Sequence, residues 1–76
     1  MGDSMDVLTK KQRIVLAMAK HRPVSALDVR RIYNSIRYGR NALEKLVAFG
    51  YLKHSELLGR FEITEKGEQA LLGYDI

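Results

Sequence analysis

The sequence predicts a small α+β domain that is mainly α, built from three helices, a two-stranded β-hairpin and a final helix. Three observations lead to this prediction. Apolar residues recur at helical spacing in three segments before residue 50, two short alternating segments then flank a glycine, and a capped segment of helical character follows. A chain of 76 residues has room for one domain. We place this domain at 9–76 and a flexible N-terminal tail at 1–8.

The first predicted helix covers about 9–21. Thr9 and Gln12 have the spacing of a capping box, in which each side chain bonds the other residue's backbone N–H. The run 14–19 contains good helix formers with apolar groups on more than one face, so we expect this helix to be largely buried. Pro23 ends it, because the residue before a proline is pushed out of the α region.

The second predicted helix covers about 26–33. Ser25 is its expected N-cap, and Asp28 places a negative charge in the first turn, where the helix dipole favours it. The residues expected on its packing face are Val29, Ile32 and Tyr33.

The third predicted helix covers about 36–49. Asn34, which tolerates a left-handed backbone, suits the tight turn before it, and Ser35 is the expected N-cap. A buried stripe follows at helical spacing, formed by Ile36, Gly39, Leu43, Leu46 and Val47. Gly39 costs about 1 kcal/mol relative to alanine, which is tolerated where another helix passes close by. Gly50 ends the helix as a left-handed cap.

Two short strands around a turn glycine predict a β-hairpin over about 51–63. In the first strand Leu52 is expected to face inward and Lys53 outward. In the second strand the alternation turns Phe61 and Ile63 inward. The hairpin therefore covers the helices with one apolar face.

A last helix is predicted from Glu65 to about Leu72, with Thr64 as its cap and acidic residues in its first turn. Ala70, Leu71 and Tyr74 are available for packing there. The elements together predict one core, made of Val15, Met18, Val29, Ile32, Leu43, Leu46, Leu52, Phe61 and Ile63.

Charge and composition narrow the classes of function. The net charge is +4, but residues 20–60 carry nine basic groups against three acidic ones, whereas 61–76 are acidic. This distribution indicates either a surface for a polyanion or a solubility surface on a basic domain. The absence of cysteine excludes disulfides and thiolate metal sites, and it fits a cytoplasmic protein. No run approaches the ~18 apolar residues that span a bilayer, and the polar N-terminus does not resemble a signal peptide.

The sequence contains no recognisable catalytic set. His21 and His54 are far apart and have no clustered carboxylates beside them, so both are expected to be surface or half-buried histidines. The glycines of 59–67 lack the spacing of a phosphate-binding loop. We therefore expect no enzyme activity, no metal ion and no cofactor.

The order of elements is typical of a helix-turn-helix followed by a hairpin wing. Over 25–71, with the sequence SALDVRRIYNSIRYGRNALEKLVAFGYLKHSELLGRFEITEKGEQAL, the chain resembles the winged helix-turn-helix superfamily of transcription regulators. The most specific segments are ALEKLVAFGYL at 42–52 and FEITEKGEQAL at 61–71. The resemblance does not single out one subfamily.

The resemblance implies that the third helix is a recognition helix in the major groove of double-stranded DNA. The base-contacting residues that it implies are Arg37, Tyr38, Arg40 and Asn41. Arginine can bond O6 and N7 of guanine together, and asparagine can bond N6 and N7 of adenine. Residues at the start of such a helix reach base edges most easily. The alternative for these side chains is a solvated helix face.

Contacts to phosphate are expected from basic side chains and from hydroxyls near helix starts. We assign them to Ser25, Ser35, Lys45, Lys53 and Arg60. Arg60 stands beside the turn glycine, where wings of this superfamily often lay a basic side chain on phosphates or in the minor groove; the alternative is an ordinary exposed strand residue. Arg30 and Arg31 could also touch phosphate, but we expect them to be solvated.

Two classes of function follow. The leading one is sequence-specific binding of double-stranded DNA by a small transcription regulator. The alternative is a winged-helix module for protein–protein interaction without nucleic acid. Its contact surface would consist of Leu57, Leu58 and the acidic C-terminal segment. Leu57 and Leu58 are unusually apolar for a hairpin tip, and the other possibility for them is that they fold back on the core. The sequence leaves open whether the chain stays a monomer or forms a homodimer through 9–21 and the last helix.

Overall fold

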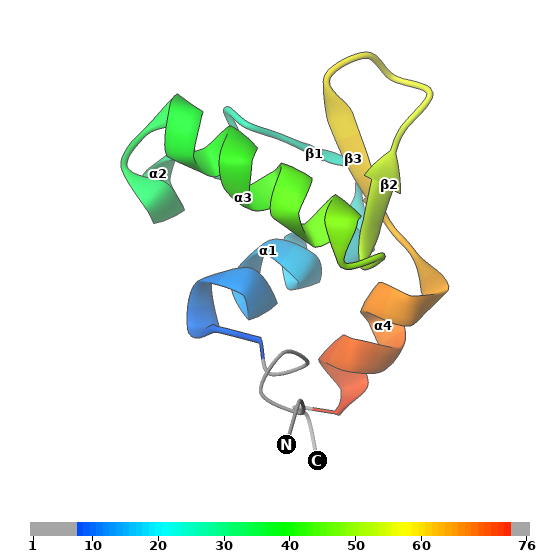
Figure 1. The fold of residues 1–76 in the computed structure, drawn as a ribbon. Coiled ribbons are helices and arrows are strands. Elements are labelled where there is room, and N and C mark those ends of the chain that lie inside the picture. The colour runs from blue at the N-terminus through cyan, green and yellow to red at the C-terminus, as the bar shows by residue number, and fades with distance from the viewer. Residues whose placement is uncertain (1–7, 74–76) are drawn as a thin grey trace.

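The computed structural model describes residues 8–73, which form four helices and one antiparallel sheet of three strands (Figure 1). The helices are α1 (Lys10–His21), α2 (Arg30–Tyr33), α3 (Ile36–Ala48) and α4 (Glu65–Leu72). The strands are β1 (Val24–Ser25), β2 (Leu52–His54) and β3 (Arg60–Ile63). This arrangement confirms the predicted α+β class. The predicted tail, apart from Leu8, lies outside the described residues, and so does Tyr74.

The sheet has one strand more than the predicted hairpin. The strand order is β1-β3-β2, so β3 lies in the middle, with Phe61 paired to Val24 of β1 and Ile63 paired to Leu52 of β2. The predicted hairpin is present as β2 and β3, and the sequence analysis missed β1 as the third strand of the sheet. A strand of two residues is too short for its sequence to show the alternation of inward and outward side chains. β1 is defined by its pairing with β3, which lies far away along the chain.

The second helix is shorter than predicted, and Ser25 is not its N-cap. Ser25 belongs to β1, and its carbonyl accepts from the backbone N–H groups of Asp28 and Val29, at 3.0 and 3.3 Å. The Asp28 carboxylate accepts in turn from the Ser25 N–H at 2.9 Å. Residues 26–29 therefore form turns, and the helix begins only at Arg30.

The other predicted helix caps are present. Thr9 and Gln12 form the complete capping box of α1, with bonds of 3.1 and 2.9 Å. Ser35 Oγ accepts from the Tyr38 N–H at the start of α3, and Thr64 Oγ1 accepts from the Gly67 N–H at the start of α4. The Thr64 hydroxyl also donates to the Gly50 carbonyl at 2.6 Å, which ties the start of α4 to the end of α3.

The end of α3 is a Schellman motif. Gly50 has a φ of +88°, its N–H donates to the Val47 carbonyl, and the Tyr51 N–H donates to the Leu46 carbonyl, both at 2.9 Å. The predicted left-handed cap at Gly50 is thus confirmed. The motif turns the chain directly into β2.

All nine residues predicted for the core lie in it or against it. Met18, Ile32 and Ile63 are partly buried at its edge, and the other six are buried. Further buried members are Leu8, Leu16, Ala19, Val24, Tyr51 and Leu71. One prediction for the buried stripe of α3 is wrong, because Ile36 is 45% exposed. The expectation that α1 is buried on several faces is also only partly met, since Ile14 is exposed.

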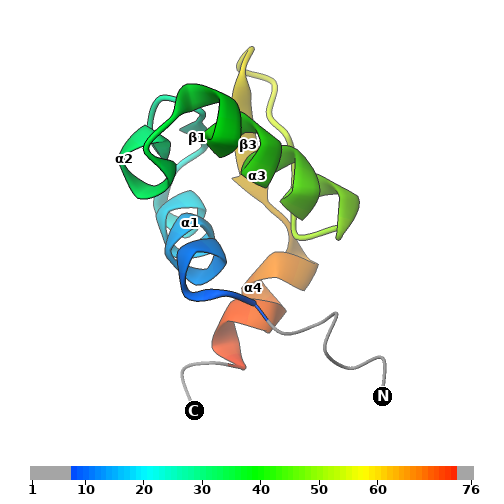
Figure 2. The ribbon, with the colours of Figure 1, turned by 60° about the vertical axis from the view of Figure 1, so that its left-hand side comes forward.

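α3 lies between α1 on one side and the β2–β3 hairpin on the other (Figures 1 and 2). Its inner face packs on α2 and β2, whereas α1 packs on α4 and β3. The outer face of α3 is left to solvent. Among residues 8–73, no helix has the length and apolar character that crossing a bilayer requires.

Candidate nucleic-acid interface

The outer face of α3 carries a row of polar side chains, Arg37, Tyr38, Arg40 and Asn41, which we call the α3 ridge. Gly39, Leu43 and Leu46 are buried, which fixes the register of the helix and turns the ridge outward. All four ridge residues are exposed, Tyr38 by 63%. No ridge side chain forms a hydrogen bond or ion pair with another of the described residues. These donors are therefore free to bind a ligand.

The position of α3 depends on a close approach of the chain before α2. Asn34, with φ 59° and ψ 24°, adopts the left-handed conformation predicted for the turn between α2 and α3. A Cβ atom added to Gly39 would lie 2.9 Å from Val29 Cγ2 and 3.4 Å from the Ala26 carbonyl oxygen. The glycine thus admits a close neighbour, as expected, although the neighbour is mainly the turn before α2 and not a helix.

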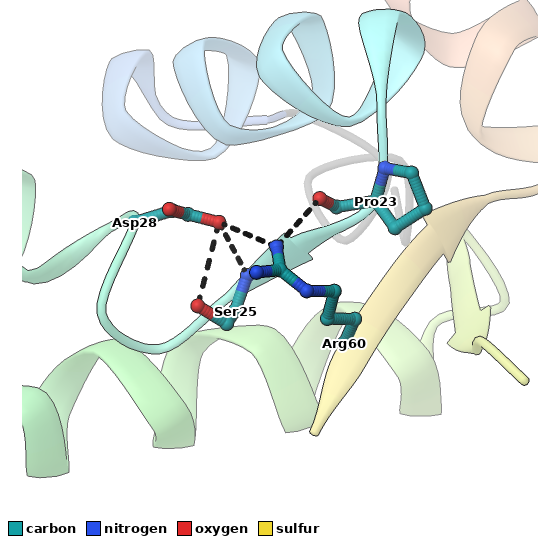
Figure 3. Close-up of polar contacts among 4 residues, drawn as sticks. All are labelled: Pro23, Ser25, Asp28 and Arg60. Carbon is teal, nitrogen blue, oxygen red and sulfur yellow. Dashed lines mark hydrogen bonds and ion pairs between the residues drawn. The ribbon is translucent and has the colours of Figure 1, made fainter. Parts of the chain in front are cut away.

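Arg60 is engaged within the domain (Figure 3). Its Nη1 donates to the Pro23 carbonyl and to Asp28 Oδ2, each at 3.4 Å. The same carboxylate oxygen accepts from the N–H and the hydroxyl of Ser25, at 2.9 and 3.3 Å. The guanidinium therefore reaches across β1 to a carboxylate. A phosphate at this position would compete with the Asp28 carboxylate for the positive charge of Arg60.

A hollow of about 590 Å³ borders α3 on the side of α1. The lining residues that matter chemically are Lys10, Lys11, Tyr33, Tyr38, Asn41 and Lys45, and we call the site the α1–α3 hollow. No carboxylate is among the described residues that line it. Lys11 Nζ lies 5.4 Å from the centre of the Tyr33 ring. Burial raises the pKa of the Tyr33 phenol. The lysines supply the charge of the hollow.

A second depression, of about 630 Å³, borders α3 on the side of the hairpin. We call it the hairpin groove; its lining includes Leu27, Ile36, Arg40, Glu44, Leu58 and Arg60. Leu58 is 100% exposed, so it does not fold back on the core. His54 Nε2 lies 4.0 Å from Glu44 Oε1, and the His54 ring stacks at a tilt on Phe61. On this side of α3 carboxylates lie close to basic side chains, Glu44 beside His54 and Asp28 beside Arg60.

The structure separates the predicted contact residues into groups. Tyr38, Asn41 and Lys45 meet in the α1–α3 hollow. Ser25, Arg40 and Arg60 line the hairpin groove. Lys53 is exposed on β2 and lines neither site, and the Ser35 hydroxyl is used as a helix cap. The predicted contacts that line a site therefore divide between the two flanks of α3.

Sequence reasoning missed Lys10, Lys11 and Tyr33 as members of a site. The lysines contributed only to the charge count, and Tyr33 was assigned to packing. One signal was available, because α1 begins with a basic pair and has no acidic residue in its first turn. Positive charge is unfavourable at a helix N-terminus, so a basic pair there indicates a use other than helix stability.

No protein-family model, curated protein or solved structure matches the chain. Within residues 8–73, no group of three or more metal-ligating side chains is placed to hold an ion. Function is therefore inferred from the α3 ridge and the two sites that flank it.

Proposed function

We propose that this chain is a winged helix-turn-helix protein that binds double-stranded DNA sequence-specifically, as a small cytoplasmic transcription regulator without enzyme activity. In this proposal α2 and α3 form the helix-turn-helix, and the β2–β3 hairpin is the wing. The observation that carries the proposal is the α3 ridge. Two arginines and an asparagine, exposed and without side-chain partners, occupy the first turns of one helix.

The chemistry of the ridge suits the edges of base pairs. The major groove is about 12 Å wide and admits one α-helix. Arg37 and Arg40 are three residues apart and lie on one side of α3, so they can address neighbouring base pairs. Asn41 can bond an adenine at two positions, and Tyr38 can pack on a thymine methyl or bond a phosphate.

The test begins with selection of bound sequences from a random duplex library, followed by titrations on the selected duplex and on a scrambled one. Arg40→Ala should weaken binding to the selected duplex by about 1–3 kcal/mol and leave the scrambled duplex nearly unchanged. Arg22→Ala, an exposed arginine away from α3, is the matched control and should change neither affinity. Equal losses on both duplexes for Arg40→Ala would mean that α3 only anchors the backbone.

The oligomeric state can be read from the same complexes. Sedimentation of the free protein and of the complex distinguishes a monomer from a homodimer. A dimer predicts a palindromic target with half-sites about one helical turn apart. A single asymmetric target bound by a monomer would remove the dimer and leave base reading by α3 in place.

One observation favours a second candidate function, a module for protein–protein interaction. Four aliphatic side chains are exposed around the hairpin groove and the hairpin tip, namely Leu27, Ile36, Leu57 and Leu58. Exposed aliphatic residues that gather in one region are typical of protein-binding surfaces. A titration with mixed-sequence duplex at two salt concentrations separates the candidates, because a protein that binds no DNA at low salt supports the interaction module.

A further inference from the structure

The two flanks of α3 differ in charge, and the difference bears on how DNA would be held. A helix that lies in the major groove has a phosphate backbone along each of its sides. One side of α3 faces the α1–α3 hollow, with Lys10, Lys11 and Lys45. The other side faces the hairpin groove. The two backbones of a bound duplex would therefore meet different chemistry.

The hairpin flank offers little free positive charge outside the α3 ridge. Arg60 faces Asp28 at 3.4 Å, and His54 lies beside Glu44. The loop between β2 and β3 carries Glu56 and two leucines and no cation. A phosphate placed here would meet three carboxylates, Asp28, Glu44 and Glu56, and an apolar tip. Among the described side chains of the hairpin, Lys53 is the one exposed lysine or arginine that forms no hydrogen bond or ion pair.

The α1 flank has the opposite character. Three lysines from two helices converge on one hollow, and its described lining contains no carboxylate that would balance them. The Tyr33 and Tyr38 rings form its aromatic part. Tyrosine hydroxyls and lysine ammonium groups are both donors to phosphate oxygens, and lysines acting as point charges give contacts that do not depend on sequence.

Building on the proposed function, we propose that the protein grips DNA on one side: the α1–α3 hollow holds the phosphates of one backbone, and the hairpin does not grip the other. Lys10 and Lys11 become phosphate-binding residues in addition to Lys45. Arg60 and Lys53, the basic residues expected to contact phosphate from the hairpin, contribute little. Specificity still comes from the α3 ridge, and the hollow supplies the part of the affinity that depends on salt.

The first experiment is a salt series on the selected duplex for the wild-type chain and two double variants. Lys10→Gln with Lys11→Gln should reduce the slope of log affinity against log salt by about two, since each phosphate contact contributes about 0.9. If the two proteins bind equally at 1 M salt, this change in slope predicts a loss of roughly 60-fold at 0.1 M salt. The matched control is Lys20→Gln with Lys53→Gln, which removes two exposed lysines from outside the hollow and should change the slope by less than about half a unit.

The second experiment locates the duplex without relying on charge. The chain has no cysteine, so Lys10→Cys and Leu58→Cys each create one attachment point for an iron chelate that cleaves nearby DNA. Cleavage from position 10 should be strong and confined to one stretch of backbone. Cleavage from position 58, at the hairpin tip, should be weak.

Each outcome decides the proposal. A smaller slope for the Lys10/Lys11 variant alone, with strong cleavage from position 10, supports it. Equal slope changes in both double variants, or strong cleavage from position 58, overturn the one-sided grip while DNA binding stands. The one-sided grip is also overturned if the Lys10/Lys11 variant keeps the wild-type salt slope while Arg40→Ala still weakens binding to the selected duplex. A wild-type chain that binds no DNA at low salt overturns both proposals.

Discussion

At the scale of the residue, the Asp28 carboxylate connects two distant parts of the chain. Its Oδ2 accepts from the backbone and the hydroxyl of Ser25 and faces the Arg60 guanidinium. One carboxylate thus fixes the turn before α2 and links it to β3. The sequence analysis identified Asp28 only as a charge in the first turn of a helix, because its partner Arg60 lies 32 residues away along the chain.

Asp28→Ala should cost more stability than Arg60→Ala. Removing the carboxylate leaves the part-buried Ser25 N–H without its acceptor, for which we expect about 1–3 kcal/mol. Arg60→Ala removes an ion pair that is 43% and 32% exposed on its two sides, and such screened pairs contribute about 0.2–1 kcal/mol. Urea unfolding of the two single variants and the double variant measures both values and their coupling. A larger loss of stability for Arg60→Ala than for Asp28→Ala would mean that the contacts of Arg60 contribute more than the hydrogen bonds of Asp28 to Ser25.

At the scale of the element, segments defined by local signals were predicted well and those defined by distant partners were not. α1, α3 and α4 begin at the predicted caps because Thr9, Ser35 and Thr64 act within one turn of the chain. β1 was missed because it depends on β3. The α3 ridge could be read from one helix, whereas the α1–α3 hollow needs two helices that only the tertiary fold brings together.

The packing of α4 against the start of β2 depends on Gly67. A Cβ atom at this position would clash with the Tyr51 carbonyl oxygen and approach Ile63 Cγ1 to 2.8 Å. Gly67→Ala should therefore destabilise the domain by about 1–3 kcal/mol or more, which outweighs the helix propensity gained, of about 1 kcal/mol.

The matched control for this glycine is Gly73→Ala at the other end of α4. Gly73 has an ordinary helical φ of −61°, and the nearest atom to an added Cβ is the Ala70 carbonyl oxygen at 3.4 Å. Its thermal unfolding midpoint should stay close to that of the wild type. Similar midpoints for the two variants would show that α4 can shift away from Tyr51 at little cost.

At the scale of the whole molecule, six of the seven elements contribute buried residues to one apolar core. The seventh, α2, contributes partly buried residues at the edge of that core. Leu46 lies in this core with no exposed surface. Its position was predicted from the stripe of α3 alone, since a helix has one face to bury. Ile36 belongs to the same stripe but is the first residue of α3, and it is exposed because the core does not extend that far.

Leu46→Ala should lower the free energy of unfolding by about 2–5 kcal/mol, as truncation of a buried leucine does. Leu58→Ala is the matched control, because the same atoms are removed from a fully exposed side chain, and its effect should stay within about 0.5 kcal/mol. Chemical denaturation with one protocol compares them. A loss of more than 1 kcal/mol for Leu58→Ala would show that the hairpin tip contributes to stability.

The central position of β3 in the sheet also predicts an order in which the domain folds. The contact between Pro23 and Arg60 closes a loop of 37 residues, an entropic cost on the order of 3 kcal/mol. The β2–β3 pairing is far more local. We expect the hairpin and α3 to be formed in the transition state and β1 to dock afterwards. In stopped-flow kinetics Val24→Ala should then mainly accelerate unfolding, whereas Leu52→Ala should slow refolding. If Val24→Ala instead slows refolding in proportion to the stability it loses, β1 docks before the transition state and the order is reversed.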